Sequence, residues 1–403
     1  MPPVQADLLL PCGVTLHGRL FKGAMSEGLG DRAGAPRPEL GRLYARWARS
    51  GIGLLITGNV MIDARALGEP GNVILEDDRH LAAFHDWAVR GQRDGTQVWV
   101  QLNHPGKQAP RGLNAETVAP SALPFPGAMG RAFATPRALT REEIHGLSGR
   151  FAASARLAQR AGFGGVQLHA AHGYLLSQFL SPRHNVRQDE YGGSPENRRR
   201  FLLETFAAVR AAVGPRFPVS VKLNSSDFVR GGLSEEESLE VVRTLGEAGC
   251  DLIEISGGTY EKPMMMLGRG ERGGFFADFS RRAREVAGVP VGVTGGFRDA
   301  DVIREALDSG AADLIGLGRP LAVDPDFAGR VLRGETLPRL ARPGRTGVRA
   351  VDRSGSFDTL WHEDALRRHS RGQPVRPDED MRLALLRILA STGVQAALRQ
   401  RRA

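Results

Sequence analysis

The chain has 403 residues, 41% hydrophobic and 25% charged, which is the composition of an ordinary globular protein that is long enough to bury a large core. This composition excludes a disordered, collagen-like or coiled-coil chain, and two cysteines exclude a disulfide framework or an iron–sulfur cluster held by four thiolates. The net charge of +9 comes from arginines spread along the chain, with only four lysines among 54 basic residues, so we expect no nucleic-acid partner.

Eight short apolar segments have the length and the aliphatic residues of strands that are buried on both faces. In chain order they are residues 19–24, 53–57, 97–101, 165–169, 219–223, 252–256, 291–294 and 313–317. Amphipathic patterns predict helices between and after them, at residues 38–50, 79–93, 140–161, 195–213, 234–248, 279–287, 299–309 and 324–333. Capping residues support three of these helix starts: Thr140 with Glu143, Ser194 with Asn197, and Ser234 with Glu237.

Eight strand-then-helix units predict an α/β fold, a (β/α)8 TIM barrel, over residues 1–335. An open doubly wound sheet would carry a Gly-x-Gly-x-x-Gly turn in its first unit, and that unit has none. Residues 336–403 follow the eighth unit, and we expect a C-terminal helical extension packed on the barrel or on a second subunit. Its last helix is predicted at 379–402, with Leu385, Leu386 and Leu389 near one face.

Two loops stand out from the regular repeat. Residues 104–136 form a long segment rich in proline and glycine after the third strand, and loops of that length in a compact domain are usually functional. Together with the loop at 260–276, this segment is expected to govern the choice of substrate.

The active site of a TIM barrel lies at the carboxyl ends of its strands, so the residues that end the strands are the candidates. The fourth strand ends in His169, followed by His172 and Tyr174. Two histidines three residues apart lie on one side of a helical turn and can donate N–H bonds to a carbonyl oxygen, while the phenol can supply a proton. The spacing leaves two alternatives open: structural histidines, or a metal pair, for which no third ligand follows at a usual spacing.

The last two strands end in glycine-rich turns, 294–296 and 316–319, at the place where such barrels often hold a phosphate. Backbone N–H groups of glycine can approach phosphate oxygens and Arg319 can bind them in a fork, although ordinary tight turns would look the same. Gln101 ends the third strand with an amide that can both donate and accept. Lys222 ends the fifth strand, where a buried ammonium requires a negative partner.

A longer motif identifies a family. The segment 164–182, GGVQLHAAHGYLLSQFLSP, continues through the run YGGS at 191–194, and it is accompanied by RLFKGAMS at 19–26 and QLNHPGK at 101–107. With these motifs the chain resembles the Old Yellow Enzyme family of FMN-dependent ene-reductases, also called NADH:flavin oxidoreductases, from about Leu9 to Leu332. The chain departs from the family's residue pattern at two positions: Lys222, where many members have arginine, and Ser26, where members have threonine or cysteine. The lack of a cysteine cluster after the barrel indicates the cluster-free, single-barrel subgroup.

The resemblance implies a role for each matching residue. His169 and His172 would hold the carbonyl oxygen of the acceptor, Tyr174 would be the proton donor, and no metal would bind. The residues implied to contact FMN are Ala24, Met25, Ser26, Gly58, Gln101 and Lys222 around the ring, and Gly295, Gly296, Gly318 and Arg319 at the phosphate.

The predicted function is reduction of activated C=C bonds in α,β-unsaturated carbonyl compounds, by ping-pong hydride transfer from NADH or NADPH through flavin N5. Two alternatives stay open: a flavin-dependent NAD(P)H oxidase or quinone reductase, and a non-redox barrel that binds a phosphorylated ligand. The expected partner is a small electron-poor alkene or enone. Since the sequence has no secretory signal and no apolar run of about 18 residues, we expect a cytoplasmic protein without a membrane partner. A homo-oligomer stays an open alternative, in which the C-terminal extension would pack on the second subunit.

Overall fold

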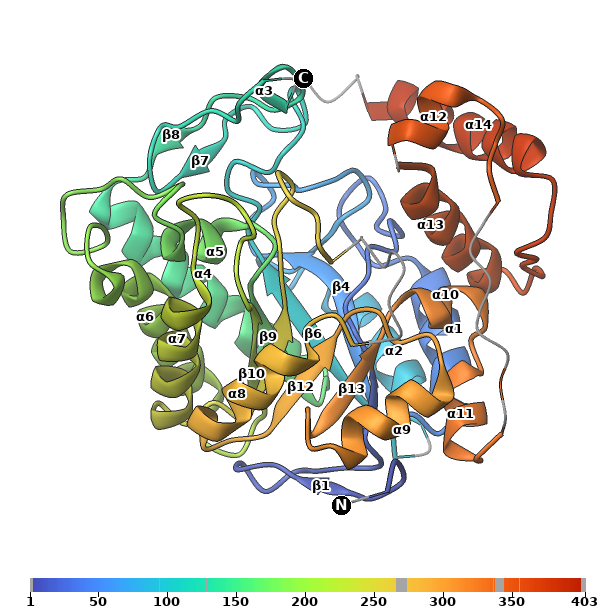
Figure 1. The fold of residues 1–403 in the computed structure, drawn as a ribbon. Helices are drawn as coiled ribbons and strands as arrows, with labels where there is room; N and C mark the ends of the chain where they lie inside the picture. The colour runs from blue at the N-terminus through green and yellow to red at the C-terminus, as the bar shows by residue number, and fades with distance from the viewer. Residues whose placement is uncertain are drawn as a thin grey trace.

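The computed structural model describes residues 3–399, except 94, 128, 266–273, 336, 338–343 and 355. Its centre is a barrel of eight parallel strands (Figure 1): β3 (Leu20–Lys22), β4 (Leu54–Met61), β6 (Gln97–Asn103), β9 (Gly165–Ala170), β10 (Val219–Asn224), β11 (Leu252–Ser256), β12 (Val291–Thr294) and β13 (Leu314–Leu317). Each strand pairs with the next one along the chain, and β3 closes the ring by pairing with both β4 and β13. The short strand β5 (Val73–Ile74) lies outside the ring, on β4. The predicted (β/α)8 barrel is therefore confirmed.

The helices surround the barrel much as the amphipathic patterns predict. They are α1 (Pro38–Ala48), α2 (Leu81–Gly91), α4 (Arg141–Arg160), α6 (Pro195–Val213), α7 (Glu235–Glu247), α8 (Ala277–Ala287) and α9 (Ala300–Asp308). The caps expected at Thr140, Ser194 and Ser234 each accept a backbone N–H three residues on, and Thr140 with Glu143 completes a capping box.

The last unit differs from the prediction of one helix at 324–333. A short helix α10 (Arg319–Val323) starts directly after β13, and a second, α11 (Phe327–Leu332), follows it. Asp324 separates the two in an extended conformation. The cause is local, because Asp324 precedes Pro325 and the proline ring disfavours the helical region for the residue before it.

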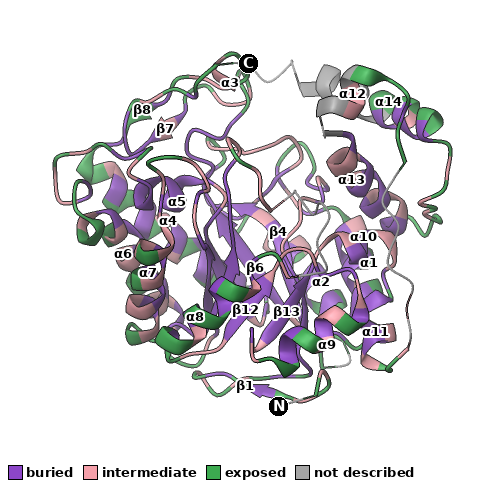
Figure 2. Cartoon of the chain, in the orientation of Figure 1, coloured by how far each residue is buried: buried purple, intermediate pink, exposed green. Residues whose placement is uncertain are grey.

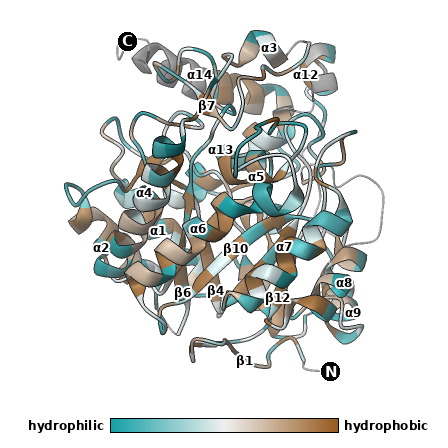
Figure 3. Ribbon diagram, turned by 90° about the vertical axis from the view of Figure 1, so that its left-hand side faces the viewer, coloured by the Kyte–Doolittle hydropathy of each residue, from teal (hydrophilic) through white to brown (hydrophobic). Residues whose placement is uncertain are grey.

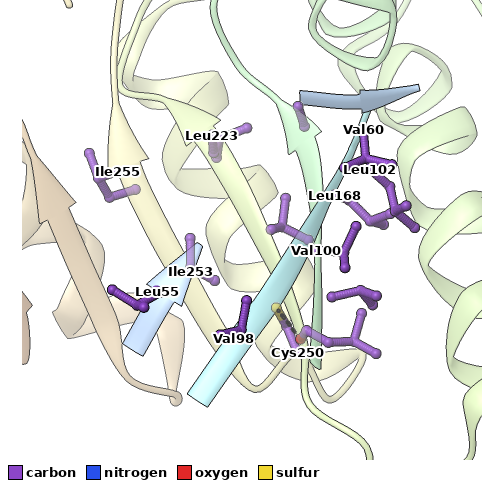
Figure 4. Close-up of a cluster of buried hydrophobic side chains, with 14 of the residues drawn as sticks. Leu55, Val60, Val98, Val100, Leu102, Leu168, Leu223, Cys250, Ile253 and Ile255 are labelled. Atoms are coloured by element: carbon purple, nitrogen blue, oxygen red, sulfur yellow. Dashed lines mark hydrogen bonds between the residues drawn. The ribbon is translucent and has the colours of Figure 1, made fainter. Parts of the chain in front are cut away.

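The barrel strands bury both faces (Figure 2). One face packs outward under the helices, where the aliphatic side chains form a continuous cluster (Figure 4) that includes Leu55, Val98, Val100, Leu168, Leu223, Ile253 and Ile255. The alternate residues face the barrel interior because successive side chains of a strand point to opposite faces.

At the amino end of the barrel these interior residues are apolar and meet a hairpin. Strands β1 (Leu8–Leu9) and β2 (Thr15–Leu16) pair antiparallel below the barrel (Figure 1). Leu8, Leu10 and Leu16 of this hairpin cluster with the interior side chains Phe21, Leu54, Ile56, Trp99, Leu252 and Leu314. This end is thus a packed plug, and the opening of the barrel lies at the carboxyl ends of the strands.

The loops at that carboxyl end carry additional elements. The long segment 104–136 contains β7 (Val118–Ala119) and α3 (Met129–Ala132), and β7 pairs with β8 (Arg137–Ala138) just beyond it. A short helix, α5 (Leu175–Leu180), follows the turn after β9. Figures 1 and 3 place β7 and α3 at the end opposite β1. Of the predicted substrate loop 260–276, residues 266–273 lie outside the described part.

The C-terminal extension consists of α12 (Arg349–Ser354), α13 (Ser356–Ser370) and α14 (Met381–Arg399). It has a small core of its own, and α13 packs on α10 and α1 of the barrel. Leu385, Leu386 and Leu389 do not together form the packed face of α14. Leu385 is buried, whereas Leu386 and Leu389 are more than half exposed, because the buried stripe of α14 runs through Met381, Ala384, Leu385 and Ile388. The domain boundary at 335/336 stays a prediction, since residue 336 lies outside the described residues.

Candidate active site at the carboxyl end of the barrel

The interior of the barrel changes from apolar to polar towards its carboxyl end. Gln101 of β6 donates to the Gln167 side chain at 2.7 Å, and Gln167 in turn donates to Glu254 at 2.9 Å. Glu254 also accepts the hydroxyl of Thr294 at 2.7 Å and pairs with the Lys222 ammonium at 2.7 Å. The barrel register places Gln101 beside Gln167 and Lys222 beside Glu254. A connected polar layer therefore lies where the barrel opens.

Lys222 has the negative partner that its position requires, and that partner is Glu254. The two side chains are 3% and 0% exposed. Asp227, a carboxylate near Lys222 in the sequence, accepts instead from the Asn224 amide at 3.0 Å and the Leu233 backbone N–H at 2.9 Å. Sequence reasoning missed Glu254 and Gln167. The available signal was a single polar residue between apolar neighbours on a strand expected to be buried on both faces.

His169 and His172 come together, but not on a helical turn as predicted. His169 lies within β9, and His172 sits in the following turn with a left-handed φ of 61°. The strained turn is held by backbone contacts: the His172 N–H donates to the Asn224 side chain at 3.0 Å, and its carbonyl accepts from Gln108 at 3.0 Å. The two imidazole rings meet edge to face with their centroids 5.2 Å apart.

Hydrogen bonding restricts the roles of the two imidazoles. Nδ1 of His169 accepts the Ala171 backbone N–H at 3.3 Å, so its proton resides on Nε2, which is a donor. Nε2 of His172 contacts the Ser256 hydroxyl at 2.8 Å, which leaves Nδ1 for other partners. Burial lowers the pKa of both histidines well below the ordinary value, and the Lys222 charge adds to this effect. Both rings are therefore neutral near pH 7.

Tyr174 lies against His169, with the ring centroids 4.7 Å apart. Its hydroxyl is 3.0 Å from the hydroxyl of Tyr260 and 3.5 Å from the side-chain amide nitrogen of Asn59. Burial raises the pKa of Tyr174 well above the usual value, so the phenol keeps its proton. Tyr260, which the sequence did not single out, follows β11 in the loop beside the site.

The segment after β3 carries Ala24, Met25 and Ser26, which are partly exposed at the barrel rim. The next residue, Glu27, is buried and accepts hydrogen bonds from Tyr44 at 2.6 Å and from Lys22 at 3.2 Å. A β-carbon at Gly58 would lie only 2.1 Å from the Glu27 carboxylate and 2.3 Å from the Met25 carbonyl. Gly58 is thus a position at which only glycine fits against the segment that follows β3.

The glycine-rich turns after β12 and β13 also lie at this rim. Gly295 and Gly296 have φ values of 144° and 85°, a region that favours glycine. Gly318 precedes α10 without a capping side chain, and its nearest neighbour on the side-chain face is the sulfur of Met25. Arg319 begins α10, and its guanidinium pairs with Asp358 of α13 at 3.2 Å.

Helix α13 contributes further charged groups beside the rim. Burial, followed by the nearby charge of Glu69, raises the pKa of Glu363 to about 7, while Arg367 opposes this rise. Glu69 accepts from Asn72 at 3.3 Å, and burial raises its pKa too. A small cavity lined by Ser26, Asn59 and Glu69 opens here.

The donor set around the rim fits FMN. The Gln101 amide and the Lys222 ammonium suit the polar edge of an isoalloxazine ring, which accepts and donates hydrogen bonds and gathers negative charge on reduction. The side-chain-free turns at Gly295, Gly296 and Gly318 with Arg319 suit a phosphate. Across the described ranges, no group of three or more His, Cys, Asp or Glu side chains could hold a metal ion. No helix within those ranges is long and apolar enough to cross a membrane.

Comparison with known proteins gives the family. The model of the NADH:flavin oxidoreductase / NADH oxidase family matches residues 12–337. The chain is 40% identical over 347 residues to the NADH-dependent flavin oxidoreductase iliE of Hypocrea jecorina (strain QM6a), which covers 79% of this chain and 86% of that protein. It is 36% identical over 281 residues to the NADPH dehydrogenase of Geobacillus thermodenitrificans (strain NG80-2), covering 65% and 79% respectively.

Among solved structures, the old yellow enzyme homologue from Zymomonas mobilis has a TM-score of 0.73 at 26% identity, covering 84% of this chain and 94% of that one. The family model spans the whole barrel, which includes every residue of the polar layer and of the rim turns. The non-redox alternative has no support among these relatives. The chain therefore belongs to the NADH:flavin oxidoreductase / NADH oxidase family, the Old Yellow Enzyme family, and is a flavin-dependent oxidoreductase that uses FMN with NADH or NADPH.

Proposed function

We propose that the protein reduces the activated C=C bond of α,β-unsaturated carbonyl compounds, with NADH or NADPH as the reductant. The observation that carries this proposal is the grouping of two neutral imidazoles and a protonated phenol at the carboxyl end of β9. Reduction of an enone needs donors for the carbonyl oxygen and a proton for the α-carbon. An acceptor such as oxygen needs no such set.

FMN would be held by the rim residues. Gln101 and Lys222 would contact the polar edge of the ring, while Ala24, Met25, Ser26 and Gly58 would lie along its remaining edge and face. Gly295, Gly296, Gly318 and Arg319 would bind the phosphate. The chemistry that bound FMN supplies is hydride transfer, from the nicotinamide to N5 and onward to the acceptor.

The protein groups orient and polarise the acceptor. The Nε2–H of His169 donates to the carbonyl oxygen, and the Nδ1–H of His172 joins it when the Ser256 hydroxyl donates to Nε2 of that ring. These donors stabilise the negative charge that develops on the oxygen as the β-carbon gains a hydride. Tyr174 then gives its hydroxyl proton to the α-carbon.

Replacing Tyr174 by phenylalanine tests this assignment. Tyr174→Phe should leave FMN binding and reduction by the nicotinamide unchanged and slow the reduction of a cyclic enone by about 10²- to 10⁴-fold, the usual contribution of general acid catalysis. Tyr191→Phe is the matched control, because the Tyr191 hydroxyl bonds Glu204 of α6. Stopped-flow absorbance resolves the two half-reactions.

Two results would contradict the proposal. An enzyme that reduces quinones or oxygen but no enone would favour the oxidase or quinone-reductase alternative. Unchanged enone reduction in Tyr174→Phe, with the chemical step rate-limiting, would remove this residue from the role of proton donor.

Replacing both His169 and His172 by alanine should weaken the binding of enones and phenols, measured by titration of the flavin spectrum.

A further inference from the structure

Tyr260 forms a pair with the proposed proton donor. The two hydroxyl oxygens are 3.0 Å apart, and the ring centroids of Tyr174 and Tyr260 are 6.0 Å apart. The residues are separated by 86 positions in the sequence and reach this contact from the loops after β9 and β11. The Tyr174 hydroxyl also contacts the amide nitrogen of Asn59 at 3.5 Å, which can donate a hydrogen bond but is too weak an acid to pass on its proton.

Both sequence neighbours of Tyr260 are fixed to the loop after β9. Thr259 forms a bridge with His172, and it exchanges backbone hydrogen bonds with Lys262 at 3.0 and 3.1 Å. Glu261 binds the Arg183 guanidinium with contacts of 2.7 and 3.1 Å, and it lies 3.4 Å from His184. The position of the Tyr260 hydroxyl is therefore set by the fold before a substrate arrives.

The charged groups around Tyr260 come from two other elements. Burial, and then the charge of Glu69, raise the pKa of Tyr260 to about 12; the hydrogen bond with Tyr174 opposes this rise and the charge of Glu363 on α13 adds to it. Arg367 of α13 lies close enough to lower the pKa of both carboxyls. Burial likewise raises the pKa of Tyr174. Both phenols therefore keep their protons near pH 7, and the 3.0 Å contact allows the hydroxyl of Tyr260 to donate to that of Tyr174.

Resting on the function proposed above, we propose that Tyr260 passes its hydroxyl proton to Tyr174 while Tyr174 protonates the α-carbon of the acceptor. The O–H bond of Tyr174 breaks as the C–H bond forms, and the O–H bond of Tyr260 breaks as a new one forms on Tyr174. The alkene gains this proton and the hydride that reduced FMN supplies, so it is reduced by two electrons. The negative charge ends on Tyr260, which regains a proton from water when the product leaves.

A proton inventory tests this transfer. The rate of enone reduction by the NADH-reduced, FMN-bound enzyme is measured in mixtures of H₂O and D₂O. For the wild type we expect a curved dependence on the deuterium fraction, because two protons move in one step. For Tyr260→Phe we expect a linear dependence and a rate about 10-fold lower, which corresponds to a lost hydrogen bond of about 1.4 kcal/mol. Tyr191→Phe, the control, should behave as the wild type.

A linear inventory in the wild type overturns the proposal and needs no variant to fold. A Tyr260→Phe enzyme that binds FMN and keeps the wild-type rate or the curvature overturns it as well. The proposed function is tested separately. Enone reduction is refuted if the wild type reduces no enone, and the role of Tyr174 as proton donor is refuted if Tyr174→Phe reduces the enone at full rate. Slow reduction by Tyr174→Phe together with full-rate reduction by Tyr260→Phe would refute only the proton transfer between the tyrosines.

Discussion

Lys222→Met removes one partner of a fully buried ion pair. The ammonium lies 2.7 Å from the Glu254 carboxylate, and neither side chain is more than 3% exposed. Removing one partner leaves an uncompensated buried charge, which typically costs about 3–5 kcal/mol. Glu254 keeps the hydrogen bonds from Gln167 and Thr294, so we expect a loss near 3 kcal/mol, the lower end of that range. Adding Glu254→Gln removes the orphaned charge and should restore most of the free energy of unfolding, measured by urea denaturation of the flavin-free protein.

The same two residues should shift the flavin reduction potential in opposite directions. If Lys222 faces the ring edge that gathers negative charge on reduction, Lys222→Met lowers the potential by about 20 mV for each kcal/mol of lost stabilisation, from the scale of 30 mV per 1.4 kcal/mol. Glu254→Gln should raise the potential, because the ammonium then has no counter-charge. Lys222→Arg keeps the charge and should give a smaller change if its larger head fits.

A redox titration of the FMN-bound proteins decides whether Lys222 shifts the reduction potential of the flavin. Lys222→Met should also be reduced more slowly by the nicotinamide, because reduction is less favourable. A Lys222→Met protein that folds, binds FMN and keeps the parent potential would refute the contact between Lys222 and the flavin. The pair with Glu254 would then serve only the packing of the barrel interior.

Arg319→Ala should raise the Kd for FMN by about 10- to 100-fold, the equivalent of a charged hydrogen bond of about 1.5–3 kcal/mol, and leave the Kd for riboflavin unchanged. Equal losses for the two flavins in a fluorescence titration would contradict a phosphate contact, since riboflavin has no phosphate. Burial lowers the pKa of His104 to about 4 and that of His184 to about 3, so the folded protein keeps both rings neutral while the unfolded chain binds protons below about pH 6.5. The free energy of unfolding should therefore be highest above that pH and fall on acidification by about 1.4 kcal/mol per pH unit for each histidine. A free energy of unfolding that stays constant between pH 7.5 and 4.5 would show that these imidazoles are not buried in the neutral form.

Local patterns in the sequence determined the strands, most helices and the helix caps. These features depend on residues within a few positions of one another, as in the capping box of Thr140 and Glu143. The placement of polar residues at strand ends also followed from the sequence, because all parallel strands of a barrel end at the same face. The resemblance to a family added the cofactor, which family membership now supports.

Only the tertiary structure decided which polar groups meet. Lys222 pairs with Glu254 because β10 and β11 align in register, while Asp227, nearer in the sequence, turns to Asn224 and Leu233. The hydroxyl of Tyr260 reaches Tyr174 because Thr259 and Glu261 are fixed to another loop.

The left-handed turn at His172 and the contact of Arg319 with α13 likewise depend on long-range packing. The residue pattern of a segment indicates the periodicity of that segment and the caps of its helix. The partner of a side chain is set by strand register and by which loops lie side by side, and these are properties of the closed barrel as a whole.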